Sequence, residues 1–191
     1  MLSMKPTKRE APLTFTVCKY GSFLFTRAAG ISARSALQEQ VEAAAPVSML
    51  IIDFAGTDAM TNSFTDEFLG KFYVSLAAGD VNVDGVQLVG LNEETRDAIT
   101  VCLGRRKQFA VDGDAHALIG DAEVLAETYE QARSLGSFRA AVLADALQLS
   151  LPNANNRLKR LVEAGALRRE RTSVPERGLS LIHISEPTRP Y

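Results

Sequence analysis

Hydrophobic and polar residues follow two rhythms in the N-terminal part of the chain, and each rhythm predicts one kind of element. Apolar residues recur at helical spacing over residues 32–44, 63–76 and 93–108. Shorter apolar runs predict strands over residues 14–19, 22–26, 47–54 and 86–91. The run VSMLIIDF is apolar for most of its length, which is typical of a strand covered on both faces. Alternating strands and helices predict an α/β fold with a mostly parallel sheet and right-handed crossovers.

Residues 111–120 interrupt this alternation because they are rich in glycine and aspartate. That composition favours a loop, so we expect a linker there between a first domain, residues 13–110, and a second, residues 121–178. The second domain begins with a predicted helix over residues 122–135. We expect its Tyr129 to pack against the rest of that domain or in a dimer interface.

The segment LADALQLSLPNANNRLKRLVEAGALRRE, residues 143–170, predicts a helix, a tight turn, a second helix and a short basic strand. Ser150 stands where an N-cap belongs, and Pro152 falls in the first helical turn, where its missing N–H costs nothing. Gly165 is expected to end the second helix. Helical spacing predicts a buried face made of Ala154, Leu158 and Leu161, which Leu167 continues into the strand.

The opposite face of this second helix carries amides and cations, groups that pair with base edges and phosphates in a DNA major groove. The segment resembles the winged helix-turn-helix of bacterial transcription regulators, whose recognition helix commonly ends in a pattern like RLVEAGAL here. The resemblance implies binding to double-stranded DNA, as a homodimer on a palindromic site. Base contacts are expected from Asn153, Asn155, Asn156 and Arg157. Phosphate contacts are expected from Lys159, Arg160, Arg168, Arg169 and Arg171.

Charge is divided unevenly along the chain. Residues 1–133 hold 12 Lys and Arg against 18 Asp and Glu, a net charge of −6, whereas residues 134–178 hold 8 against 4, a net charge of +4. A small basic domain joined to a larger acidic one is typical of a nucleic-acid reader attached to a sensing or docking domain. Chance partition of surface charge is the alternative, and the clustering of cations on one helix face and the following strand argues against it.

The segment IIDFAGTDAMTNSFTDEFLGKF, residues 51–72, resembles the STAS-like family, relatives of the bacterial anti-sigma-factor antagonists. The sequences LFTR at 24–27 and AR at 33–34 also match the pattern ahead of the first helix of that family. The resemblance implies a mostly parallel sheet with helices that acts as a sensing or interaction domain. In the antagonists, a strand bearing an aspartate precedes a serine that a partner kinase phosphorylates, and the aligned positions here are Asp53 and Ser63.

Ser63 allows two interpretations from the residues alone. At the start of a helix, free backbone N–H groups and the positive dipole end would stabilise an attached phosphate, so Ser63 is a candidate regulatory phosphosite. It also begins a capping-box-like sequence with Asp66 three residues later, and Asp66 and Glu67 would repel a phosphate. A purely structural cap is therefore the other interpretation.

Thr26, Arg27 and Arg34 are candidate contacts for a partner or an anion, because two guanidinium groups lie around Gly30, which is expected to form a turn into a helix. The alternative is an ion pair with one of the acidic residues Asp53, Asp58 or Glu67.

The two ends of the chain are expected to add nothing to the fold. Residues 179–191 include LSLIHISEPTR, which matches the translation of a transposon-end sequencing adapter, so they are expected to form a non-native tail without structure. The winged helix is then expected to have a truncated wing that lacks its return strand. Residues 1–12 are polar, lack the apolar core of a signal peptide and are expected to be flexible.

Composition and motifs argue against catalysis. Cys18 and Cys102 are the two cysteines, and they show neither metal-ligand spacing nor a disulfide framework, which fits a reducing cytoplasm. No phosphate loop, dinucleotide fingerprint or nucleophile elbow is present, so no enzyme activity, cofactor or metal is expected. The adjacent Asp66 and Glu67 would point about 100° apart on a helix and cannot flank one substrate atom. No apolar run approaches a membrane span, so no membrane contact is expected.

These patterns predict a non-enzymatic bacterial regulator whose STAS-like domain senses or docks while the winged helix-turn-helix binds DNA and controls transcription. The alternative is a partner-switching protein that resembles the anti-sigma-factor antagonists. It would be phosphorylated or docked by a histidine-kinase-like ATPase, or bound by an anti-sigma factor, and its winged helix would make protein contacts.

Overall fold

The computed structural model describes residues 12–171 and 180–184. Its N-terminal part contains β1 (Leu13–Thr16), the 3₁₀ turn η1 (Val17–Tyr20), β2 (Phe23–Leu24), α1 (Arg27–Ala44), β3 (Leu50–Asp53), β4 (Ala59–Met60), α2 (Asn62–Thr65), the π-helical turn η2 (Asp66–Gly70), α3 (Lys71–Ala78), β5 (Val86–Val89), α4 (Glu93–Arg105), β6 (Phe109–Asp112) and β7 (Ala117–Gly120). The fold is mixed α/β, as the sequence predicted.

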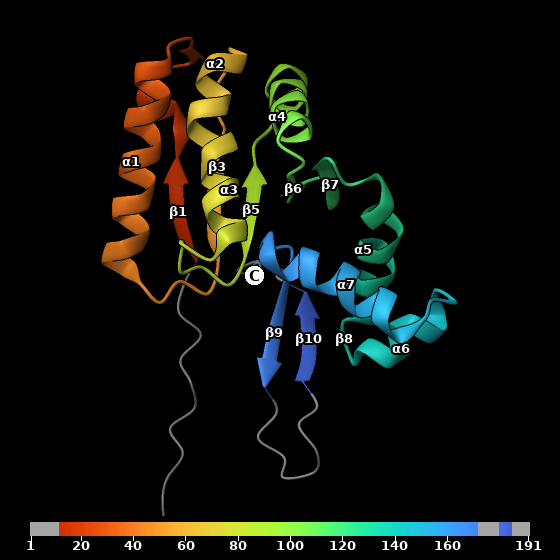
Figure 1. The fold of residues 1–191 in the computed structure, drawn as a ribbon. Coiled ribbons are helices and arrows are strands. Elements are labelled where there is room, and N and C mark those ends of the chain that lie inside the picture. Colours follow the sequence, from red (N-terminus) through yellow and green to blue (C-terminus); the bar gives the residue numbers. More distant parts are fainter. Residues whose placement is uncertain (1–11, 172–179, 185–191) are drawn as a thin grey trace, which may run out of the picture.

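The central sheet has five strands in the order β1-β3-β5-β6-β7. The first four are parallel to one another, and β7 returns antiparallel to β6. Every parallel step moves in the same direction across the sheet, so right-handed crossovers bring the connecting helices to one face. Helices α1, α3 and α4 stand together in front of the sheet (Figure 1). Between the sheet and the helices lies the larger hydrophobic core, which includes Phe15, Leu37, Leu50, Ile52, Phe68, Phe72, Leu88 and Ile99.

The C-terminal part consists of helices and a small sheet: α5 (Glu123–Leu135), β8 (Ser137–Phe138), α6 (Ala140–Ala146), α7 (Leu151–Glu163), β9 (Leu167–Arg171) and β10 (Ser180–Ile184). Strand β10 lies between β8 and β9 and is antiparallel to both. A second hydrophobic core joins these elements, with Leu125, Leu143, Leu158, Leu161 and Leu167 among its members. Tyr129 is buried in this core, one of the two roles expected for it.

Strand β6 belongs to both cores. Phe109 and Val111 point into the C-terminal core, whereas Ala110 points into the larger one, since successive side chains of a strand face opposite sides. A second joint connects the start of β5 to the end of α7, where the backbone N–H of Val86 donates to the carbonyl of Gly165 at 3.0 Å. The two parts are therefore packed into one body in this structure.

The predicted linker at residues 111–120 is not a loop. These residues form the end of β6 and all of β7, a hairpin in which Phe109 lies opposite Gly120 and Asp112 opposite Ala117. Glycine and aspartate are common in hairpin turns as well as in longer loops, so this composition does not distinguish the two.

Helix α1 begins earlier than residue 32, where the sequence pattern placed it. Thr26 is its N-cap, and its hydroxyl accepts a hydrogen bond from the Ala29 N–H at 3.1 Å. Gly30, expected in a turn, lies inside α1, and a Cβ there would meet the Phe64 carbonyl oxygen at 2.7 Å. The glycine therefore lets α1 approach α2 closely. The predicted strands at 14–19 and 22–26 are shorter than expected and belong to separate sheets.

Two expectations are wrong for residues 180–184, namely that they have no structure and that the basic strand before them lacks a return strand. They form β10 and supply the return strand, with Ile182 opposite Arg169 of β9 and Phe138 of β8. The remaining parts of the predicted flexible terminus and tail, residues 1–11, 179 and 185–191, lie outside the described residues. Within the described ranges, no helix has the length and apolarity needed to cross a membrane.

Two glycines with left-handed backbone test how closely α7 is joined to the sheet. Gly165 has φ +70° and a Cβ there would lie 2.9 Å from the Val86 nitrogen, whereas Gly79, φ +82° at the end of α3, has open space around it. Gly79→Ala should cost about 1 kcal/mol of unfolding free energy from backbone strain alone. Gly165→Ala should cost about 1–3 kcal/mol more, because Val86 must move. Urea unfolding of the two variants measures the difference, and equal costs would contradict a tight joint.

Candidate functional site

Helix α7 is built as the sequence predicted. The Ser150 hydroxyl accepts from the Asn153 N–H at 3.4 Å, and Pro152 lies in the first turn. Ala154, Leu158 and Leu161 are fully buried against the second core. The opposite face presents exposed amides and cations to solvent, namely Asn153, Asn155, Asn156, Lys159 and Arg160. Five of the predicted DNA contacts therefore lie together on one exposed helix surface.

Arg157 does not share this exposed surface, although it was expected to contact bases. Its guanidinium Nη1 donates to the Thr128 hydroxyl of α5 at 3.0 Å, and Thr128 is fully buried. The Nε atom of Arg157 is also buried, with no hydrogen-bond partner in the described part of the chain. In this structure Arg157 therefore braces α7 against α5. The sequence could not show this, because the two residues are 29 positions apart.

The remaining predicted phosphate contacts are placed differently. Lys159 forms an exposed ion pair with Glu163 at 3.6 Å, a contact that water screens and that leaves the ammonium accessible. Arg169 is exposed on β9 and Arg168 is half-buried. The side chain of Arg171 lies outside what the structure describes.

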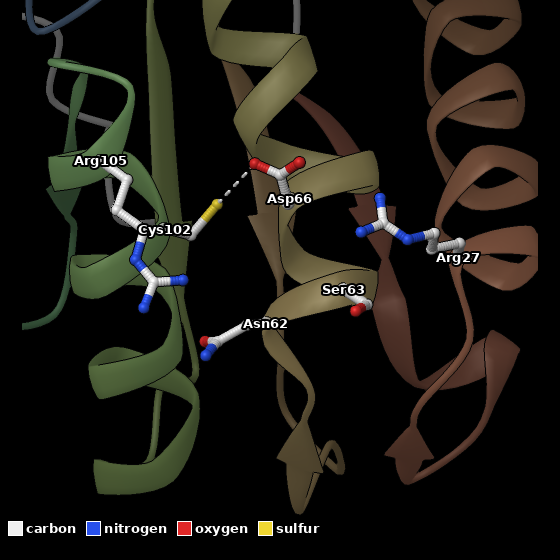
Figure 2. Close-up of a pocket in the computed structure, with 6 residues that line it drawn as sticks. All are labelled: Arg27, Asn62, Ser63, Asp66, Cys102 and Arg105. Carbon is white, nitrogen blue, oxygen red and sulfur yellow. Dashed lines mark hydrogen bonds between the residues drawn. The ribbon is translucent and has the colours of Figure 1, made fainter.

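A second candidate site is a pocket of about 260 Å³ on the N-terminal part. It is lined by six residues from α1, α2, η2 and α4: Arg27, Asn62, Ser63, Asp66, Cys102 and Arg105. Figure 2 shows Arg27 and Arg105 on opposite sides, with Ser63 and Asn62 between them. The pocket joins two predicted site residues, Arg27 and Ser63, with others that the sequence analysis did not assign to a site.

Ser63 is not the cap of its helix. Thr61 is the N-cap of α2, and its hydroxyl accepts from the Phe64 N–H at 3.3 Å and donates to the Phe25 carbonyl at 2.8 Å. The expected capping box between Ser63 and Asp66 is therefore wrong. Ser63 lies one position inside the helix and lines the pocket instead.

The two adjacent carboxylates of η2 form ion pairs with different helices. Asp66 binds Arg106 in a bidentate pair, with Nε–Oδ1 at 2.6 Å and Nη2–Oδ2 at 2.8 Å. Hydrogen bonding from Arg106 lowers the pKa of Asp66 below its usual value, and the same pair raises the pKa of Arg106. Glu67 binds Lys71 at 2.7 Å and Arg27 at 3.3 Å, so one of the expected alternatives for Arg27 is confirmed. Lys71 is the main reason that the pKa of Glu67 is lowered.

Cys102 lines the pocket, and its thiol has low reactivity. Its thiol donates to the Asp66 carboxylate at 3.7 Å. Burial, and then the negative charge of Asp66, raise the pKa of Cys102 to about 11. The thiol therefore stays protonated at neutral pH and is a poor nucleophile.

Two other predicted residues do not reach the pocket. Thr26 serves as the cap of α1, and Arg34 is half-buried further along α1, outside the set of lining residues. Arg105 and Asn62 also line the pocket, and neither was among the site residues predicted from the sequence. Three successive cations at 105–107 were the available signal, but which of them faces Asp66 depends on how α4 packs against η2.

The pocket presents groups that can hydrogen-bond to an anion. It offers two guanidinium groups, a hydroxyl and an amide, while Asp66 is already neutralised by Arg106. In residues 12–171 and 180–184, no group of His, Cys, Asp and Glu is arranged to hold a metal ion. Comparisons with protein-family models, with curated proteins and with solved structures found no match.

The Asp66–Arg106 pair should make the free energy of unfolding decrease as the pH is lowered. The pKa of Asp66 is lower in the folded protein than in the unfolded chain, where it is about 4. The stabilisation is therefore complete above about pH 4 and is lost as pH falls through the lower folded value. Asp66→Asn should cost on the order of 1 kcal/mol at pH 7, because a third of the Asp66 side chain is exposed and the pair is partly screened.

Denaturant unfolding at pH 7 and at pH 3 measures this effect. The difference between wild type and Asp66→Asn should shrink at the lower pH. Asp58→Asn, at an exposed aspartate, removes the same charge and serves as the control. An Asp66→Asn difference that stays constant with pH would contradict the assignment.

Proposed function

We propose that this protein is a non-enzymatic bacterial regulator that binds duplex DNA through α7. The C-terminal part, which resembles a winged helix-turn-helix, acts as the reader. The N-terminal part, which resembles the STAS-like family, acts as the sensing or docking module. The observation that carries the proposal is the exposed face of α7, where three amides and two cations lie together while the opposite face is anchored in a buried core.

Three further features support a DNA reader. Helices α6 and α7 are joined by a tight turn at residues 147–150, in which Gln148 adopts φ +52°. Helix α7 is followed by the β9–β10 hairpin, which adds exposed Arg169 beside it. The segment 134–178 carries a net charge of +4, in contrast to −6 for residues 1–133. Cations around an exposed amide-rich helix suit a phosphate backbone flanking a major groove.

Binding to random-sequence duplex DNA should weaken steeply as salt rises, because phosphate contacts release counterions. The full chain carrying Lys159→Ala and Arg160→Ala should bind more weakly, and the slope of log affinity against log salt should fall by about 2. A matched control, Lys19→Ala with Lys107→Ala, removes two exposed cations from the N-terminal part and should leave the slope unchanged. Fluorescence anisotropy over a salt series measures both. Binding that is absent at low salt, or equally weakened by the control, would contradict the proposal.

A second candidate function is partner switching through Ser63, and the pocket gives it a specific argument. Thr61 takes the capping role, and Asp66 is neutralised by Arg106, so neither feature opposes a phosphoryl group on Ser63. Arg27 and Arg105 line the same pocket and are the cations that would receive it. A histidine-kinase-like ATPase or an anti-sigma factor would then be the partner, and the C-terminal part would make protein contacts.

Phosphoserine placed at position 63 tests this second candidate. It should raise the melting temperature by roughly 2–6 °C through new charge-assisted hydrogen bonds, and the gain should disappear in Arg27→Ala/Arg105→Ala. Phosphoserine at exposed Ser35 of α1 is the control and should give no comparable gain. A similar shift at both positions, or none at position 63, would argue against the pocket as a phosphoryl site.

A further inference from the structure

The exposed face of α7 carries uncharged residues in its first half and cations in its second half. Its first half carries Leu151, Pro152, Asn153, Asn155 and Asn156, all exposed and uncharged. The cations Lys159 and Arg160 come later along the helix. Leu151, 47% exposed, is the large apolar side chain of this half.

Arg157 lies midway along α7 but does not contribute a cation to the exposed face. Its guanidinium is held by Thr128 on the inner side of the helix, so the first half of the exposed face contains no cation. Guanidinium groups are the side chains that most often read guanine, through its O6 and N7 atoms in the major groove. The structure therefore leaves the first half of α7 without a group suited to guanine.

The groups that remain have complementary partners on the other base pair. An asparagine amide makes two hydrogen bonds to adenine N6 and N7, and an apolar side chain contacts the 5-methyl group of thymine. Leu151 and Asn155 are four residues apart and so are neighbours on the helix surface, and Asn153 and Asn156 are neighbours at a spacing of three. This places an apolar group beside one amide along one edge of the exposed face and the other two amides along the opposite edge.

We propose that α7 selects A·T base pairs in the major groove, with the asparagines reading adenine and Leu151 reading the thymine methyl. The inference rests on the DNA binding proposed above and names its substrate class. Lys159 and Arg160 contact the flanking phosphates and add affinity without sequence preference. Arg157 acts as a positioning residue that keeps α7 braced against α5.

The first test is selection of bound duplexes from a random pool with the full chain, which should enrich sites containing A·T pairs. Each selected A·T pair is then replaced by inosine·cytosine, which keeps the minor-groove pattern of A·T but presents that of G·C in the major groove. Affinity should fall roughly tenfold to hundredfold at a pair read by an asparagine. Thymine replaced by deoxyuridine loses only its methyl group and should cost about fourfold at one position.

Two variants assign these effects to side chains. Leu151→Ala should remove the sensitivity to deoxyuridine, and Asn155→Ala should reduce the sensitivity to inosine at one pair. Val124→Ala truncates another exposed apolar side chain, on α5, and should change neither. Circular dichroism and melting temperature confirm that each variant is folded.

The outcomes separate this inference from the proposed function. If no duplex binds at low salt, DNA binding itself is wrong, and the base preference fails with it. If binding is salt-sensitive but the pool shows no enrichment, or enriches G·C pairs, the reader stands and the A·T preference is wrong. If inosine substitution is tolerated, A·T pairs are recognised through the minor groove or through DNA shape, and the role assigned to α7 is overturned.

Discussion

Strand β6 imposes the constraint on which the rest of the structure depends, because its alternate side chains enter two different hydrophobic cores. Ala110 packs under the helices of the main sheet, while Phe109 and Val111 fill the core beneath α5 and α7. The contact between Gly165 and Val86 adds a second joint. With one strand shared and one backbone hydrogen bond across the junction, the exposed face of α7 has a fixed direction relative to the sheet.

Ion pairs connect the helices that cover the other face of the main sheet. Asp66 and Glu67 are adjacent in sequence, yet Asp66 binds Arg106 after α4 and Glu67 binds Arg27 on α1. These ion pairs connect the buried turn η2 to α1 and to the end of α4, and the pocket lies between the two ion pairs. Four cations, Arg27, Lys71, Arg105 and Arg106, lie around these two carboxylates, and this excess of positive charge gives this part of an acidic domain a local attraction for anions.

Local features were predicted well from the sequence because they depend on residues close together in the chain. The cap at Ser150, the Pro152 position and the buried stripe of α7 follow from helical geometry alone. Strand β3 and helix α4 were also expected near their observed positions. The β6–β7 hairpin was mistaken for a linker, because Gly and Asp occur both in loops and in tight hairpin turns.

The sequence by itself determined the α/β pattern, the amphipathic α7 and the division of charge along the chain, since each is a property of spacing or composition. Tertiary structure decided which polar groups are available for binding. Arg157 points inward because it donates to Thr128 of α5. Ser63 is available because Thr61 caps the helix in its place. Asp66 is not available, because the packing of α4 against η2 pairs it with Arg106. These contacts join residues that are distant in sequence or compete for one role, and only the folded arrangement determines which contact forms.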